Sequence, residues 1–234
     1  MGAGIAQVLL QAGEHVVLCE AGEPAAGAAR ARVARGLSRA GAGTGPLERL
    51  EACASVPDCD ASLALEAVPE DVALKQRVLA AIEGHVPTDA LIASNTSSLS
   101  IGALARDLAR PGRFVGMHFF NPVPRSALVE LVVGPATDTG TVEAARAWVR
   151  RLGKEEIVVA DAPGFATSRL GVAIGLEAIR MLEEGVASAE DIDRGMVLGY
   201  RFPMGPLRLT DLVGLDVRLA IAEHLASTLG PRFD

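Results

Sequence analysis

Residues 63–98 read LALEAVPEDVALKQRVLAAIEGHVPTDALIASNTSS, and this stretch decides the fold. Two short apolar runs, at residues 63–68 and 90–94, predict buried strands because they are too short for helices. The segment between them, from residue 70 to about residue 83, has the composition of a helix. A strand, a helix and a second strand in succession are typical of a parallel βαβ unit.

The same alternation extends in both directions from this stretch. Further strands are predicted at residues 16–19, 114–120, 129–133 and 157–160, and further helices at residues 2–10, 24–40 and 141–152. We therefore predict an α/β fold that contains parallel βαβ units and has a doubly wound sheet. Such a fold normally begins with a strand, whereas this chain begins with a helix. The sheet is therefore expected to lack its first strand and to have a gap at its centre.

The pattern changes near the sequence Ala-Pro-Gly at residues 162–164. Predicted strands stop there, and three or four helices follow, at about residues 166–184, 189–198 and 205–229. We expect two domains: an α/β domain at residues 1–161 and an all-helical domain at residues 162–234.

The composition excludes several classes of protein. With 50% hydrophobic and 22% charged residues, the chain is not disordered. Its net charge of −7 argues against a nucleic-acid partner. No apolar run approaches the ~18 residues of a membrane span, and the first run lacks the basic lead of a signal peptide. The chain has an odd number of cysteines, and none of them forms a C-x-x-C motif: they are Cys19, Cys53 and Cys59. We therefore predict buried free thiols in a reducing cytoplasm, and no metal site.

A carboxylate closes the predicted strand at residues 16–19. In dinucleotide-binding folds, an acidic residue at this position accepts hydrogen bonds from the adenosine ribose and repels a 2′-phosphate. Glu20 therefore favours NAD over NADP, with an ordinary solvated glutamate as the alternative. Gly2 and Gly4 fit either the end of a phosphate-binding G-x-G-x-x-G loop or glycines that pack a helix.

Polar residues also stand at the ends of later strands. Residues 94–98 follow one strand, at the carboxyl end where open α/β sheets bind ligands. His118 lies near the end of the next strand, and Glu130 lies inside an apolar run. A carboxylate within a strand needs a partner, and a carboxylate holds a histidine in one tautomer that accepts a proton readily. These residues predict an NAD-linked enzyme with a His118–Glu130 pair, or alternatively a structural histidine beside an edge-strand glutamate.

Six segments, in this order, resemble the signatures of the 3-hydroxyacyl-CoA dehydrogenase family. They are LEAVPED at residues 65–71, SNTSSL at 94–99, MHFFNPVP at 117–124, DAPGF at 161–165, EEGVASAEDID at 183–193 and PMGP at 203–206. Within that family, the chain most resembles the bacterial 3-hydroxybutyryl-CoA dehydrogenases. The resemblance implies a Rossmann-type NAD-binding domain, a helical domain for substrate binding and homodimer formation, and a cytoplasmic enzyme of fatty acid metabolism.

The resemblance also implies roles for individual residues. The reaction would be the reversible oxidation of the 3-hydroxyl group of a short-chain 3-hydroxyacyl-CoA thioester to the 3-oxoacyl-CoA, with hydride passing to NAD. His118 matches the family's base, and Glu130 matches the carboxylate that orients this base. Ser97 matches a serine near the substrate oxygen and the nicotinamide. The other cofactor-binding residues that the resemblance implies are Gly2, Glu20, Glu70, Lys75 and Asn121.

One position departs from the family pattern. The family reads P-G-F-x-x-N-R, and its asparagine helps to position the substrate, whereas this chain reads PGFATSR with Ser168 in that place. A hydroxyl group lacks the separate donor and acceptor of an amide. Losing one such contact costs roughly 1–3 kcal/mol, so we expect weakened activity or an altered substrate.

Both ends of the chain also differ from the family. The family begins with a strand and a Gly-x-Gly sequence ahead of the position of Met1, and it continues beyond the position of Phe233. We therefore expect the chain to be truncated at both ends. The alternatives are a catalytically impaired fragment, a non-catalytic remnant of the family, and a related dehydrogenase that acts on a free hydroxy acid.

Overall fold

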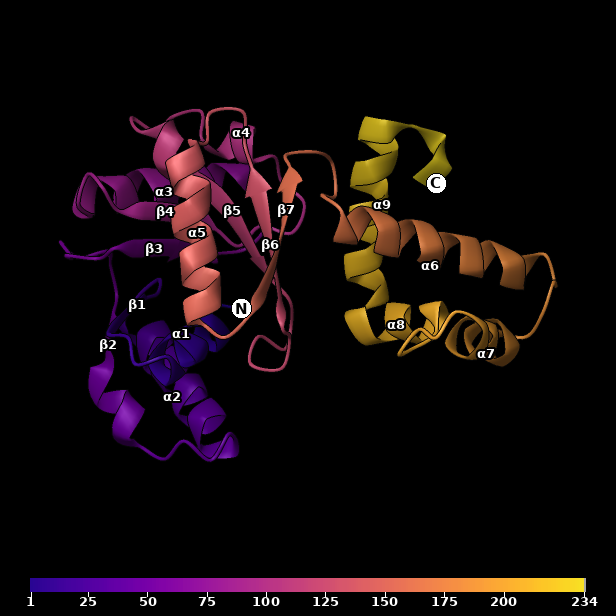
Figure 1. The fold of residues 1–234 in the computed structure, drawn as a ribbon, viewed down its shortest axis with the longest axis horizontal. Coiled ribbons are helices and arrows are strands. Elements are labelled where there is room, and N and C mark those ends of the chain that lie inside the picture. The colour runs from indigo at the N-terminus through magenta and orange to yellow at the C-terminus, as the bar shows by residue number, and fades with distance from the viewer. Residues whose placement is uncertain (234) are drawn as a thin grey trace. The chain divides into compact units, whose positions relative to one another are not determined.

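The apolar runs of residues 1–161 form strands in the computed structural model, which describes residues 1–233 (Figure 1). The strands are β1 (Val16–Cys19), β2 (Leu50–Cys53), β3 (Leu63–Glu66), β4 (Leu91–Ser94), β5 (Phe114–Phe119), β6 (Leu128–Val133) and β7 (Glu155–Ala160). The helices are α1 (Gly2–Gln11), α2 (Glu23–Arg39), α3 (Val72–His85), α4 (Ile101–Leu104) and α5 (Thr139–Arg151), with 3-10 helices at Gly45–Arg49 and Pro111–Arg113. These elements make up one unit, Met1–Asp161, and a second unit begins at Ala162.

The strands of the first unit pair in two sheets. β1 and β2 form a parallel pair, and the other five strands follow the order β3–β4–β5–β6–β7. Within residues 1–233, this division agrees with the gap that the sequence predicts in the sheet. β3, β4 and β5 are parallel, and so are β6 and β7, but β5 and β6 are antiparallel. Residues 120–127, which connect β5 to β6, are too few for the crossover that parallel strands need, and this explains the antiparallel pair.

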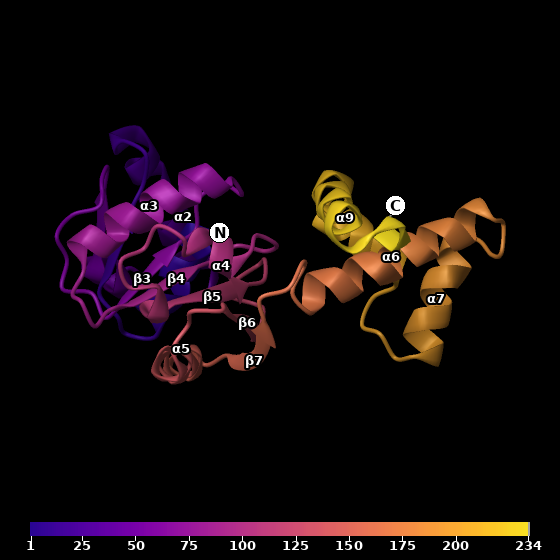
Figure 2. The ribbon, with the colours of Figure 1, turned by 90° about the horizontal axis from the view of Figure 1, so that it is seen from above.

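Helices cover both faces of the larger sheet (Figure 2). α5 and α1 pack on one face, where Val8, Met117, Val129 and Val149 belong to one buried apolar cluster. α3 packs on the opposite face, against β3 and β4. Burying each such side chain contributes roughly 1.5–3 kcal/mol. The apolar clusters thus hold the strand ends, where the polar residues gather, in fixed positions.

The strand β2 is an element that the sequence analysis does not predict. It has only four residues, and its Glu51 is exposed, so the apolar pattern at this position is weak. β2 pairs with β1 in a register that places Cys53 opposite Cys19. Cys19, Cys53 and Cys59 are free thiols, but they are half-buried rather than buried as expected.

The second unit is helical, as the sequence predicts. Its helices are α6 (Thr167–Glu183), α7 (Ala189–Gly199), α8 (Pro206–Val213) and α9 (Leu215–Leu229), followed by a 3-10 helix at Pro231–Phe233. The helical stretch predicted at residues 205–229 is divided into two helices, because Gly214 has a φ of 104° that interrupts the helical backbone. Val172, Ala222, Leu225 and Phe233 form the buried core of this unit.

Nowhere in residues 1–233 does a helix have both the length and the apolar character that a membrane crossing requires.

Candidate active site

The carboxyl ends of β3, β4 and β5 lie at one edge of the larger sheet, because these strands are parallel. Asn95, directly after β4, connects this edge. Its backbone N–H donates to the carbonyl oxygen of Glu66 at 2.8 Å, and its side-chain Oδ1 accepts from the backbone N–H of Phe119 at 2.8 Å. Open α/β sheets bind their ligands at this edge.

His118 and Glu130 meet at the pairing of β5 with β6. They are opposite each other in the antiparallel register, so their side chains leave the sheet on the same face. The His118 Nδ1 atom lies 3.0 Å from Glu130 Oε2, and Glu130 is fully buried. Because an ionised carboxylate only accepts hydrogen bonds, Nδ1 donates to it, and a neutral imidazole then carries its acceptor lone pair on Nε2. This is the tautomer that can take a proton from a substrate.

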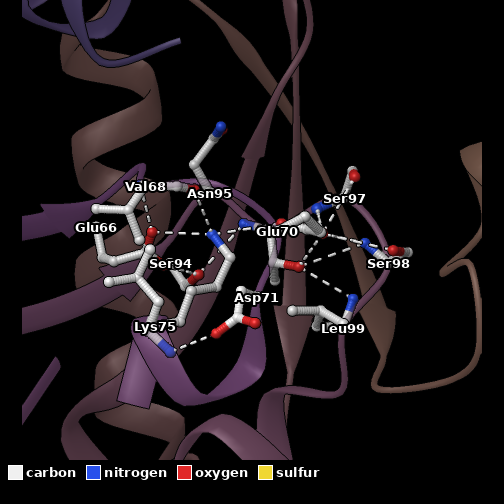
Figure 3. A network of polar contacts seen from close by, with 12 residues as sticks. Glu66, Val68, Glu70, Asp71, Lys75, Ser94, Asn95, Ser97, Ser98 and Leu99 are labelled. Atoms are coloured by element: carbon white, nitrogen blue, oxygen red, sulfur yellow. Dashed lines mark hydrogen bonds and ion pairs between the residues drawn. The ribbon is translucent and has the colours of Figure 1, made fainter. Parts of the chain in front are cut away.

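A buried ion pair lies beneath the same edge (Figure 3). Glu66, the last residue of β3, accepts hydrogen bonds at Oε1 from Lys75 Nζ at 2.8 Å and from the Val68 backbone N–H at 2.6 Å. Its Oε2 atom accepts from the Ser94 hydroxyl at 2.6 Å. The Lys75 side chain is 1% exposed and the Glu66 side chain is not exposed. This pair ties together the ends of β3 and β4 and the first turns of α3.

Glu70 extends the same network to the loop after β4. Its Oε2 atom lies 3.3 Å from Lys75 Nζ, and its Oε1 atom accepts from the Thr96 hydroxyl at 2.5 Å and from the Ser97 backbone N–H at 2.9 Å. The hydroxyl of Ser97 donates to the same oxygen at 3.2 Å. Burial raises the pKa of Glu70, but the Thr96 hydrogen bond and the Lys75 charge outweigh it, so this pKa is lowered from its ordinary value. Glu70 is therefore a fixed anion that holds the loop at residues 96–98.

The structure brings Ser97, Glu70 and Lys75 together, but it places Lys75 underneath the other two. The Lys75 ammonium group contacts Glu66, Glu70 and the carbonyl oxygen of Val68 at 3.0 Å. Because its side chain is 1% exposed and is held by these groups, Lys75 presents almost no surface to a bound molecule.

Gly2 and Glu20 lie on other elements of the same unit. Gly2 begins α1, and a Cβ atom placed on it would lie 3.9 Å from the Cβ atom of Ala67, so the helix start adjoins the end of β3. Glu20 directly follows β1, its side chain is 31% exposed, and it lies 3.5 Å from the guanidinium group of Arg32. The first turn of α1 carries no acidic side chain. A helix start without acidic side chains and a strand-end carboxylate fit NAD, because they suit its pyrophosphate and its ribose hydroxyl groups.

Asn121 is exposed in the loop that follows β5. The second lysine of the chain, Lys154, holds this loop, because its Nζ atom donates to the carbonyl oxygen of Val123 at 2.7 Å and to that of Ser126. Burial lowers the pKa of Lys154. The two lysines of the sequence therefore anchor two loops at the same edge of the sheet.

Ser168 lies in the first turn of α6, in the second unit. Gly164 and Phe165, which precede α6, have positive φ values of 71° and 51°, and they turn the chain into the helix.

Several residues of this edge carry no role in the sequence analysis. Glu66, Asn95, Thr96 and Lys154 join its strands and loops. The signal for Glu66 is present in the sequence, since a glutamate inside an apolar strand needs a buried cation, and Lys75 follows nine residues later in a chain with few lysines.

Two family models together match almost the whole chain. The model described as "3-hydroxyacyl-CoA dehydrogenase, NAD binding domain" matches residues 1–162, and the model of the C-terminal domain matches residues 164–234. The 3-hydroxybutyryl-CoA dehydrogenase of Mycobacterium tuberculosis is 40% identical over 236 residues, which cover 96% of this chain and 82% of that protein. The enzyme of the same name from Bradyrhizobium diazoefficiens is 39% identical and is covered over 80% of its length by 96% of this chain.

A solved structure agrees with these matches. The crystal structure of (S)-3-hydroxybutyryl-CoA dehydrogenase from Ralstonia eutropha superposes with a TM-score of 0.94 at 40% identity, over 100% of this chain and 86% of that chain. Domain order, fold and sequence thus lead to one conclusion: the chain belongs to the 3-hydroxyacyl-CoA dehydrogenase family of NAD-dependent oxidoreductases.

Proposed function

We propose that this chain catalyses the NAD-dependent, reversible oxidation of the 3-hydroxyl group of a short-chain 3-hydroxyacyl-CoA to the 3-oxoacyl-CoA. The observation that carries the proposal is the buried contact of His118 with Glu130 at the ligand-binding edge of the sheet. The relatives named 3-hydroxybutyryl-CoA dehydrogenase support the short-chain thioester as substrate.

The chemistry requires a base, because an alcohol loses its hydroxyl proton as it loses hydride. We assign this proton to Nε2 of His118. Glu130 acts through the imidazole: it holds the productive tautomer, and its negative charge stabilises the imidazolium that forms. Bound NAD supplies the acceptor for the hydride. In the reverse direction, His118 returns the proton to the oxygen of the 3-oxo group.

Ser97 is proposed to contact the substrate oxygen beside the nicotinamide. Glu70 supports this role, since it fixes both the backbone N–H and the hydroxyl group of Ser97. Gly2 and Glu20 are proposed to hold the pyrophosphate and the adenosine ribose, and Asn121 to contact the cofactor from the loop after β5. Glu70 is the last of the proposed cofactor-binding residues, and Lys75 contacts its carboxylate from the protein interior.

We further propose a homodimer in the cytoplasm. In the second unit, an apolar groove of about 260 Å³ is lined by residues that include Val172, Leu215 and Leu219. Leu215 and Leu219 are 62% and 59% exposed. Contiguous exposed apolar side chains of this kind are typical of protein–protein interfaces. The free thiols support a reducing compartment.

The test of the proposed function is the oxidation of NADH by the purified chain with acetoacetyl-CoA as substrate. We expect NADH consumption that depends on the CoA thioester and that free acetoacetate does not replace. Consumption with the free acid alone would favour a hydroxy-acid dehydrogenase. No consumption with either compound, in a chain that binds NADH, would favour the non-catalytic remnant.

Ser168→Asn is expected to raise kcat/KM for acetoacetyl-CoA. The substitution restores the amide that the family carries at this position, and one such hydrogen bond is worth roughly 1–3 kcal/mol, or about 5- to 150-fold in rate. Steady-state kinetics of the parent and the variant measure this change, with Ser227→Asn as a control on an exposed part of α9. An unchanged kcat/KM would contradict the assignment of Ser168 to substrate positioning.

A further inference from the structure

Two thiols face each other at the ends of β1 and β2, away from the His118–Glu130 pair. Cys19 and Cys53 are direct partners in the parallel register, and their Sγ atoms are 3.2 Å apart. Paired positions on neighbouring strands are about 4.7–4.9 Å apart. This separation falls within the roughly 4.4–6.8 Å between Cα atoms that a disulfide spans. The sulfur atoms can therefore bond through side-chain rotations and a small adjustment of the two strand ends.

We propose that Cys19 and Cys53 are an oxidation site at which a low-molecular-weight disulfide forms a Cys19–Cys53 disulfide. In the first step, the Cys53 thiolate attacks one sulfur of the small disulfide, whose S–S bond breaks and releases one small thiol. In the second step, the Cys19 sulfur attacks Cys53 Sγ as its thiol proton passes to the departing small thiolate, and the mixed disulfide breaks to release the second small thiol. The two protein thiols lose two electrons and two protons, and the small disulfide gains them.

The environment of the two sulfur atoms sets the order of these steps. Burial, followed by the hydrogen bond with Cys53, raises the pKa of Cys19 to about 12. Cys19 therefore stays protonated at neutral pH, and Cys53 is assigned the first attack. Cys53 Sγ also lies 3.0 Å from the carbonyl oxygen of Ser55, at the point where the chain leaves β2.

A disulfide at this place is expected to be reversible. It would join directly paired strands through half-buried sulfur atoms. Strained or accessible disulfides are more easily reduced than those that staple a folded core. The bond would therefore respond to the ratio of small thiols to small disulfides around the protein.

The position of the pair connects its oxidation with cofactor binding, and this step rests on the proposed function. Glu20 directly follows Cys19, and its backbone N–H donates to the carbonyl oxygen of Cys53 at 3.0 Å. A Cys19–Cys53 bond would pull on both attachment points of Glu20, the proposed ribose carboxylate. We expect the oxidised chain to bind NADH about threefold to tenfold more weakly than the reduced chain.

Thiol counting after treatment of the full chain with oxidised glutathione tests the oxidation site. We expect the free thiols to fall from three to one and the mass to fall by two hydrogen atoms, with dithiothreitol reversing both changes. Cys59→Ser, the matched control, should still form the disulfide. Cys53→Ser and Cys19→Ser should form only glutathione adducts. The proposal is overturned if Cys59 takes part in the bond, or if Cys53→Ser forms an intramolecular disulfide.

NADH titration of the reduced and oxidised chains tests the link to the cofactor. Weaker binding that dithiothreitol restores, in the parent and in Cys59→Ser, supports the link. Equal NADH affinity of both forms would overturn the link. If neither form bound NADH, the proposed function would fail, while thiol counting would still decide whether the disulfide forms.

Discussion

His118→Asn is expected to lower kcat/KM for acetoacetyl-CoA by about a hundredfold to ten-thousandfold, the usual contribution of a positioned general acid or base. Asparagine keeps a polar group of similar reach, but it cannot take up or release a proton near neutral pH. The loss should appear in kcat, because proton transfer belongs to the transition state rather than to substrate binding. Steady-state kinetics with NADH as the second substrate measure this loss.

Glu130→Gln separates the proposed supporting role from that of the base. Glutamine can still accept a hydrogen bond from His118 Nδ1, but it lacks the charge that stabilises the imidazolium. We expect an intermediate loss of kcat, with NADH affinity near that of the parent. A full loss of NADH binding would indicate damage to the fold instead.

The matched control is another histidine of the same unit. His85 lies exposed at the end of α3, where Nδ1 is 2.7 Å from the carbonyl oxygen of Ala81. His85→Asn should leave kcat/KM unchanged. If His118→Asn kept kcat/KM within a few-fold of the His85→Asn value, His118 would not be the base.

The sequence predicts most helices and strands of the first unit, but it does not predict the relative direction of every pair of strands. Short apolar runs indicate where strands lie, because apolar side chains become buried and a short run is too short for a helix. They do not mark whether neighbouring strands are parallel, so the antiparallel pairing of β5 with β6 is not predicted. The signal for an antiparallel pair is the short connection at residues 120–127, which leaves no room for a crossover helix. β2 is missed because four residues with an exposed Glu51 carry too little apolar pattern.

In the candidate site, too, the sequence predicts which residues need a partner better than it predicts where each residue lies. The meeting of His118 with Glu130 follows from one requirement, that a buried carboxylate needs a partner, and the structure places these side chains in contact. The same requirement applies to Glu66, but its partner Lys75 is explained in the sequence analysis by a resemblance instead. A resemblance places a residue near a ligand without showing whether it touches that ligand. The depth of Lys75 beneath Glu70 emerges only from the packing of α3 on the sheet.

Lys75→Met is expected to lower the free energy of unfolding of the first unit by about 3–5 kcal/mol. Removing one partner of a buried ion pair leaves an uncompensated charge in the interior, and this cost exceeds that of an ordinary lost contact. Here the charge left behind is the fully buried carboxylate of Glu66. Urea unfolding followed by the fluorescence of Trp148 measures the change, because this single tryptophan lies on α5 of the first unit.

The other lysine provides the matched control. Lys154 is also buried, but its ammonium group donates to the backbone carbonyl oxygens of Val123 and Ser126. Lys154→Met therefore leaves uncharged acceptors behind, and we expect a smaller cost of about 1–3 kcal/mol. Equal costs for the two variants would contradict the uncompensated charge as the cause.

A double-mutant cycle then isolates the ion pair itself. Glu66→Gln removes the charge but keeps an acceptor for the Val68 backbone N–H. In the double variant with Lys75→Met, no unpaired Glu66 carboxylate remains, so the double variant should lose less stability than the two single variants together. Additive losses would mean that Lys75 stabilises the unit by packing alone.

The pH dependence of stability provides a test that is independent of the double-mutant cycle. The Thr96 hydrogen bond and the Lys75 charge lower the folded-state pKa of Glu70 from 4.5, so Glu70 stabilises the parent above this value, and the stabilisation is lost as pH falls through the lower folded-state pKa. Lys75→Met lacks the part of this contribution that comes from Lys75 at neutral pH, and it has less of the contribution to lose in acid. The difference in stability between the parent and Lys75→Met should therefore narrow as the pH falls below about 4.5. A difference in stability that stayed constant or widened in acid would mean that Lys75 does not stabilise the charge of Glu70.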